Sequence, residues 1–166
     1  KAFSAGGDVK EIGQGYGNDA GFYRHMELTN QMILSLAELK KPLLAAVNGI
    51  ATGMGMNTAL CADILFASDK ARFSEIFGNI GLVPDSGGSF LLPRLIGTAK
   101  AKDLIYTARI ISAEEALDMG IVTRVFPSEE LMEETLSYGR KLAEMAPEAL
   151  KMSKYLIDNC FQTDLR

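Results

Sequence analysis

The chain has 166 residues, of which 48% are hydrophobic and 23% are charged, a composition typical of a globular domain with one apolar core. Its formal net charge of −4 and its lack of Lys/Arg clusters argue against nucleic acid as the main partner. Apolar runs such as residues 42–47 end well short of the roughly 20 residues that a membrane span needs, so no transmembrane helix is expected.

The two cysteines indicate where the protein would be found. Cys61 and Cys160 lie far apart and lack the spacing of metal ligands, which favours a reducing compartment. The first residues show no signal peptide, because no long apolar segment follows Lys1. We therefore expect a cytoplasmic or organelle-matrix protein. The chain starts without Met, in what resembles a strand end, so we expect a fragment.

The first half of the chain alternates short strands with helices. Asp8 is expected to cap a short helix through Ile12, after a strand that ends near residue 3. Apolar residues at helical spacing predict a longer helix over about 20–39. Further expectations are strands at 43–47, 63–67 and 71–75, a loop at 48–52, a helix from about 53 to 62 and a loop at 81–88 that opens another helix.

Beyond Gly97 the pattern becomes mainly helical. Ser112 and Glu115 form a capping box, and Gly120 stands where a helix-ending glycine belongs. Alternation predicts a strand over 121–126, and two amphipathic helices are expected from about 128 and 147. Together the elements predict an α/β fold, with a core over 1–97 and a helical region over 98–166 that continues the same domain.

Two glycine-rich turns each follow a strand and open a helix. The first spans residues 4–8 and the second spans residues 49–55. Each is expected to present free backbone N–H groups at the positive end of a helix dipole. One such turn alone is usually an ordinary chain turn, but two in one chain indicate a site for an anion or a developing negative charge.

These turns belong to a set of motifs that resembles the crotonase (enoyl-CoA hydratase/isomerase) family in order and spacing. The motifs are FSAGGD (3–8), AAVNG (45–49) with GMG (53–55), AD (62–63), GLVPDSGG (81–88), ISAEEA (111–116) and GIV (120–122). The resemblance implies a crotonase-like spiral of ββα units, followed by a helical C-terminal region. Family members extend beyond this chain at both ends.

The resemblance also implies site residues. In the family, two backbone N–H groups hold the thioester oxygen, and their positions fall at Gly7 and Met54. Met54 stands where the family usually has glycine, which affects pocket width rather than the donor itself. Further residues expected to contact the substrate or its coenzyme A are Ala5 and Gly6 near the adenine, Lys10 near a phosphate, and Gly53 and Phe77.

Acid–base groups distinguish the reactions of the family. Hydratases use two carboxylates, whose positions fall here at Asn57 and Phe77, and neither can carry a proton. Asp85 resembles the catalytic carboxylate of several isomerase branches, and apolar neighbours would raise its pKa toward that of a usable base. It would also be an ordinary helix cap. Glu75 faces either the same pocket or solvent, and the single histidine, His25, is expected at the surface.

The favoured prediction is an enoyl-CoA isomerase. Asp85 would move a proton between two carbons of an enolate held by Gly7 and Met54, with no metal or redox cofactor and with coenzyme A as part of the acyl-CoA substrate. The alternatives are a hydratase, a dehalogenase-like enzyme in which Asp85 attacks as a nucleophile, and a non-catalytic crotonase-like binding protein. The family resemblance further implies a homotrimer or homohexamer. The identity of the acyl group is not predicted from these residues.

Overall fold

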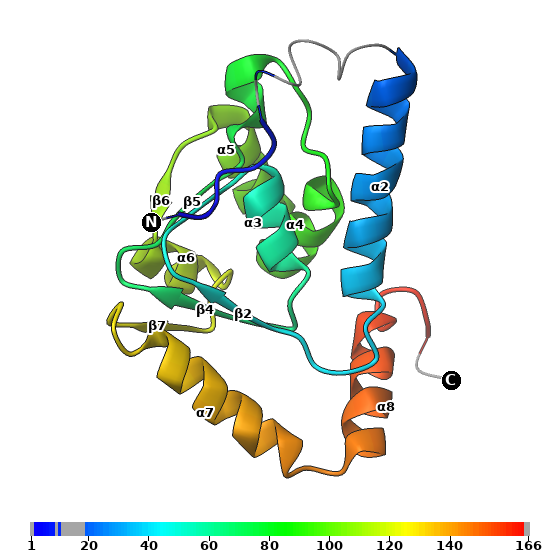
Figure 1. The fold of residues 1–166 in the computed structure, drawn as a ribbon, viewed down its shortest axis with the longest axis vertical. Helices are drawn as coiled ribbons and strands as arrows, with labels where there is room; N and C mark the ends of the chain where they lie inside the picture. Colours follow the sequence, from blue (N-terminus) through cyan, green and yellow to red (C-terminus); the bar gives the residue numbers. More distant parts are fainter. Residues whose placement is uncertain (1, 9, 11–18, 165–166) are drawn as a thin grey trace.

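The computed structural model describes residues 2–8, 10 and 19–164. The helices are α2 (Asp19–Ala37), α3 (Met54–Leu60), α4 (Gly88–Ile96), α5 (Thr98–Thr107), α6 (Ala113–Met119), α7 (Leu131–Ala143) and α8 (Pro147–Asp158), with a 3-10 helix η2 (Ile76–Ile80). The strands are β1 (Ala2–Ser4), β2 (Leu44–Val47), β3 (Ile50–Thr52), β4 (Ile64–Ser68), β5 (Arg72–Ser74), β6 (Ile111–Ser112) and β7 (Arg124–Phe126). Figure 1 shows α3 near the centre, with α2 and α8 along one side.

The strands form two small sheets. One has the order β1-β3-β5-β6 and the other has the order β2-β4-β7. All neighbouring strands run parallel except β5 and β6, which pair in the antiparallel sense. Two consecutive strands, β2 and β3, thus enter different sheets after a turn of only two residues, Asn48 and Gly49. The same change of sheet occurs between β4 and β5, so the chain winds as a spiral.

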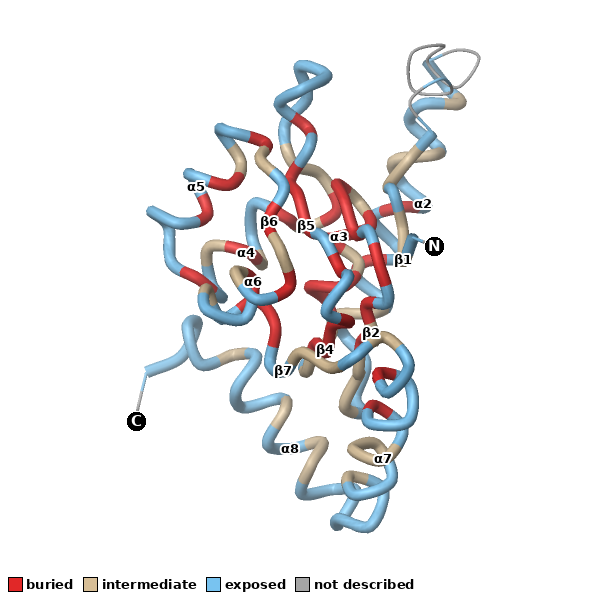
Figure 2. Tube along the Cα trace, turned by 90° about the vertical axis from the view of Figure 1, so that its left-hand side faces the viewer, coloured by how far each residue is buried: buried red, intermediate tan, exposed pale blue. Residues whose placement is uncertain are grey.

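One apolar core joins the sheets to the helices. Its members include Val47 from β2, Phe73 from β5, Leu92 from α4 and Leu104 from α5, each at most 2% exposed. Figure 2 shows the buried stretches gathered along α3, β4 and β5, whereas α8 is largely exposed. No residue of α8 is buried. Because core residues come from both sides of Gly97, the helical region packs on the same core as the spiral.

Most of the expected elements are present, and the α/β class is confirmed. Helix α2 matches the helix expected over about 20–39, and the Ser112 hydroxyl accepts the Glu115 N–H at 3.1 Å, as the capping box requires. Gly120 ends α6 with a φ of 89°. The short helix expected after Asp8 lies outside the described residues. No described helix combines the length and apolar character needed to cross a membrane.

Two expectations were wrong. The predicted loop over 48–52 contains β3, because pairing with β1 and β5 on either side extends these three residues. The strand expected over 121–126 is shortened to β7, because Ile121 and Val122 both donate their N–H groups to the Ala116 carbonyl as α6 ends. The first difference comes from pairing with distant strands, and the second comes from the way in which α6 ends.

Candidate active site

Three parallel strands end at one edge of the first sheet. Strands β1, β3 and β5 are neighbours, and their last residues are Ser4, Thr52 and Ser74. Thr52 pairs with Ser74, and Ser4 pairs one residue earlier on β3, with Ala51. The residues that follow each strand therefore meet at the carboxyl edge, which is where open parallel sheets commonly bind ligands.

The two glycine turns lie against each other at this edge. Gly6 has a φ of +89°, and a Cβ built on it would lie 3.0 Å from the Thr52 carbonyl oxygen and 3.5 Å from the Met54 nitrogen. The Thr52 hydroxyl also donates to the Ala5 carbonyl at 3.1 Å. Glycine is required here by both the backbone conformation and the close approach of the second turn.

The second turn leads directly into α3. Met54 is the first residue of this helix, so its N–H has no acceptor within the helix. A Cβ on Gly55 would lie 2.3 Å from the Ser4 carbonyl oxygen, which shows how closely α3 packs on the end of β1. Gly7, the other expected donor, directly follows Gly6. The structure thus brings the two turns together, and the convergence of both N–H groups on one oxygen stays a prediction.

Asn57 links α3 to the loop that carries Asp85. The Asn57 side chain is fully buried, and its Nδ2 donates to the Asp85 main-chain carbonyl at 3.0 Å. A Cβ on Gly88 would lie 2.5 Å from the same Nδ2, so α4 begins directly against this amide. Asp85 itself is half-buried, and its Oδ1 is enclosed without a hydrogen-bond partner. The hydrogen bond to Asn57 fixes the backbone from which the Asp85 carboxylate projects.

Glu75 lies in the same region and points inward. It is fully buried, and neither carboxyl oxygen has a hydrogen-bond partner of full geometry. Burial raises the pKa of Glu75 to about 7; the facing Asn57 amide lowers it in part, and the nearby charge of Asp85 raises it further. From the sequence, Glu75 was expected to face either the pocket or solvent, and in the structure its side chain lies in the interior.

The sequence pattern did not decide whether Glu75 lies inside or at the surface. A signal was present, because Glu75 directly follows a buried strand and precedes Ile76 and Phe77. An acidic residue at the carboxyl end of a buried parallel strand is placed where sites form. Phe77 is 6% exposed, and its ring would lie 3.6 Å from a Cβ on Gly53. Phe77 therefore lies beside the second glycine turn, and its contact with a substrate stays a prediction.

Other expected residues are less enclosed. Ala5 and Lys10 are exposed, and the Lys10 backbone N–H donates to Asp8 Oδ1 at 2.8 Å. His25 is half-buried on α2, so its expected surface position is only partly correct. No three His, Cys, Asp and Glu side chains among the described residues gather as metal ligands would.

The apolar enclosure expected around Asp85 is only partly present. Phe77 is buried, but Leu82 and Val83 are 43% and 80% exposed on the surface loop before α4. Phe90 is 49% exposed, with the Arg94 guanidinium 3.4 Å above its ring. Of the two carboxyl groups, Glu75 is the fully buried one and Asp85 is half-buried.

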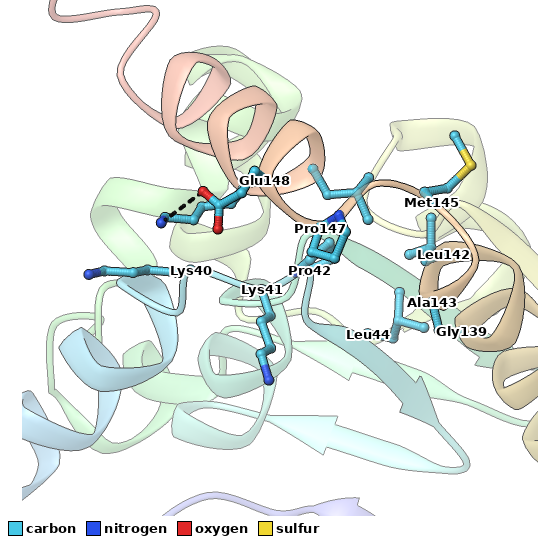
Figure 3. A pocket seen from close by; sticks show the side chains of 12 residues that line it. Lys40, Lys41, Pro42, Leu44, Gly139, Leu142, Ala143, Met145, Pro147 and Glu148 are labelled. Atoms are coloured by element: carbon cyan, nitrogen blue, oxygen red, sulfur yellow. Dashed lines mark hydrogen bonds and ion pairs between the residues drawn. The ribbon is translucent and has the colours of Figure 1, made fainter.

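Two cavities lie away from this edge. One, of about 370 Å³, is lined by the segment after α2 together with α7 and the start of α8. Figure 3 shows apolar side chains such as Leu44, Leu142 and Pro147 around it, with Lys40 and Lys41 at its border. The other, of about 660 Å³, lies among α3, α4, α7 and α8. Neither is lined by an expected site residue.

Comparisons with known proteins agree with this architecture. A family model described as enoyl-CoA hydratase/isomerase matches residues 1–165. The chain is 39% identical to a short-chain-enoyl-CoA hydratase of Clostridium acetobutylicum, over 99% of this chain and 62% of the relative. It is 41% identical to a trans-2-decenoyl-acyl-carrier-protein isomerase of Streptococcus mutans, over 79% of this chain and 51% of the relative.

Solved structures give the same result. An enoyl-CoA hydratase from Bacillus anthracis superposes with a TM-score of 0.93 at 36% identity, covering 99% of this chain and 63% of that one. The chain therefore spans between about half and two thirds of the length of these three proteins. With the matching family model, the shared fold and the paired glycine turns at one sheet edge, the chain belongs to the enoyl-CoA hydratase/isomerase family.

Proposed function

We propose that the full-length protein is an enoyl-CoA isomerase. The N–H groups of Gly7 and Met54 hold the thioester oxygen while Asp85 takes a proton from one carbon of the acyl chain and returns it to another. The negative charge that develops on the oxygen is stabilised by the two N–H groups, each of which contributes about 3–4 kcal/mol in a dry site. The substrate brings coenzyme A with it, and no metal or redox group takes part.

One observation supports this proposal above the others. The two glycine turns, which are 47 residues apart in sequence at Ala5 and Thr52, lie within hydrogen-bond contact at the carboxyl edge of the sheet. A third segment, the loop of Asp85, is tied to the helix that the second turn opens. Helix α3 thus packs on the end of β1 and is bonded to the loop of Asp85, and this arrangement supports the proposal of proton transfer at a carbon next to a thioester.

A hydratase is the second candidate, because the Clostridium relative is named as one and because Glu75 adds a second carboxyl group near Asp85. Hydration requires groups that hold and activate a water molecule above the double bond. Glu75 is fully buried and cannot present its carboxyl group to such a water in this conformation. Asn57 and Phe77 supply no acid or base. These features favour isomerisation.

The test replaces Asp85 in the full-length protein. Asp85→Asn is expected to lower isomerase turnover by about 10²- to 10⁴-fold while acyl-CoA affinity stays nearly unchanged. Deuterium incorporation from solvent into enoyl-CoA esters measures proton exchange at each carbon, and product analysis separates isomerisation from hydration. Asp103→Asn, at an exposed carboxylate on α5, is the matched control. Equal turnover in the Asp85 and Asp103 variants would remove Asp85 from the mechanism.

A further inference from the structure

Five buried oxygen atoms near Asp85 have no hydrogen-bond partner among the described residues. They are Asn57 Oδ1, Glu75 Oε1, Glu75 Oε2, Asp85 Oδ1 and Ser86 Oγ. Only the Ser86 hydroxyl can donate a proton; the rest are acceptors if both carboxyl groups are ionised. Buried polar atoms are normally paired, so this excess of acceptors indicates that one of the two carboxyl groups carries a proton and can act as a donor.

Glu75 is the better place for that proton. It is fully buried, whereas Asp85 is half-buried and retains contact with the outside. Two neighbouring carboxyl groups in one buried region do not both ionise readily, and the more enclosed one keeps its proton. The raised pKa of Glu75 has burial as its largest cause and the charge of Asp85 as a further one.

Among the described residues, no cation acts on the Glu75 carboxyl group to compensate for a negative charge. The groups that act on its carboxyl group are the Asn57 amide from α3 and Asp85 from the loop before α4. Helix α5 packs against η2, which Glu75 opens, and it carries Lys100, Lys102, Asp103 and Tyr106. All four of these residues are exposed, whereas Glu75 is fully buried. Asp85 is therefore the charged partner that Glu75 faces.

Asn57 connects the two acids. Its Nδ2 carries two hydrogens, and one of them donates to the Asp85 main-chain carbonyl at 3.0 Å. This bond fixes the orientation of the amide, because a flipped amide would place its oxygen against that carbonyl. The amide also faces the Glu75 carboxyl group, which can accept from it. Asn57 thus lies between the Glu75 carboxyl group and the backbone of Asp85.

We propose that Glu75 is a neutral carboxylic acid that acts as a positioning residue for Asp85, holding the Asn57 amide in place and leaving the single negative charge of the site on Asp85. This inference rests on the proposed function, in which Asp85 is the base. During turnover Asp85 accepts the substrate proton and returns it, while the proton of Glu75 stays on Glu75. Ionisation of Glu75 would place a second negative charge beside the enolate and disfavour its formation.

The experiment uses the full-length protein with two substitutions of Glu75. Gln keeps an acceptor for the Asn57 amide and is neutral at every pH, whereas Leu removes the acceptor. We expect Glu75→Gln to keep kcat within about threefold of the wild type below neutral pH, and Glu75→Leu to lower kcat by about 10- to 100-fold with a smaller change in KM. Glu144→Gln, at an exposed carboxylate, is the control.

The pH profile separates positioning from simple structural support. Wild-type kcat is expected to fall as pH rises through about 7, where Glu75 ionises, and the Glu75→Gln profile is expected to lack this fall. A Gln variant as impaired as the Leu variant would overturn the proposal, because the proton or charge of Glu75 would then take part directly. A fully active Leu variant would overturn it as well.

An infrared difference spectrum tests the neutral acid without any assay of activity. The wild type is expected to show, below neutral pH, the carbonyl band of a protonated carboxylic acid that Glu75→Gln lacks. Absence of that band would refute the neutral state of Glu75. A band in a protein without isomerase activity would instead refute the proposed function and leave the neutral acid standing.

Discussion

Replacing Glu75 by Gln should make the stability of the protein less dependent on pH. The pKa of Glu75 is about 7 in the folded protein, compared with 4.5 for an ordinary glutamate. A pKa that is higher in the folded than in the unfolded chain means that folding favours the protonated form. The favourable contribution is complete below about pH 4.5 and is lost as pH rises toward and through about 7.

The magnitude follows from the two pKa values. One pKa unit corresponds to about 1.4 kcal/mol, so ionising buried Glu75 lowers the free energy of unfolding by about 3 kcal/mol between acid and mildly alkaline conditions. Gln has nearly the same shape and never ionises. The variant should therefore match the wild type in acid and exceed its stability by a few kcal/mol above neutral pH.

Urea denaturation of both proteins at a series of pH values measures this difference. The expected result is a gap in unfolding free energy that opens between pH 4.5 and about 7 and then stays constant. Glu144→Gln, at an exposed position, should run parallel to the wild type throughout. A Glu75→Gln curve that also runs parallel to the wild type would show that Glu75 is ionised in the folded protein or reaches solvent.

Two further predictions concern glycines at the site. Gly6→Ala should lower kcat/KM by about 10- to 100-fold with little change in the fold. The φ of residue 6 is +89°, and the new Cβ would lie 3.0 Å from the Thr52 oxygen, so the first turn would be forced away from the second. Steady-state kinetics measure the loss of activity, and circular dichroism measures any change in the fold. Gly88→Ala should destabilise the protein by about 1–3 kcal/mol, because the new Cβ would lie 2.5 Å from Asn57 Nδ2. Urea denaturation measures this loss of stability. Unchanged stability would mean that α4 can shift freely.

Local sequence patterns predicted the elements that local forces determine. The long apolar periodicity identified α2, and the capping box at Ser112 identified the start of α6. The glycine turns were identified from their small residues between a strand and a helix, and the positive φ of Gly6 favours glycine locally. These features depend on neighbours along the chain or on backbone geometry that strongly favours glycine.

Features set by distant contacts were not predictable in the same way. Strand β3 has three residues and β6 has two, so both depend on pairing with β5 rather than on their own composition. Glu75 follows the end of β5, where the Gly53 N–H before α3 donates to the Ser74 carbonyl at 2.9 Å. Its burial becomes clear only once Asn57 and Asp85 are known to lie beside it.

The convergence of the Gly7 and Met54 N–H groups on one oxygen is the central claim and is open to direct measurement. A crystal structure of the full-length protein with a bound enoyl-CoA, in the Asp85→Asn variant to prevent turnover, would locate the thioester oxygen. The account predicts that this oxygen lies within about 3 Å of both nitrogens, with residue 85 facing the acyl carbons. A thioester oxygen bound elsewhere, or a residue 85 turned away from the acyl chain, would contradict it.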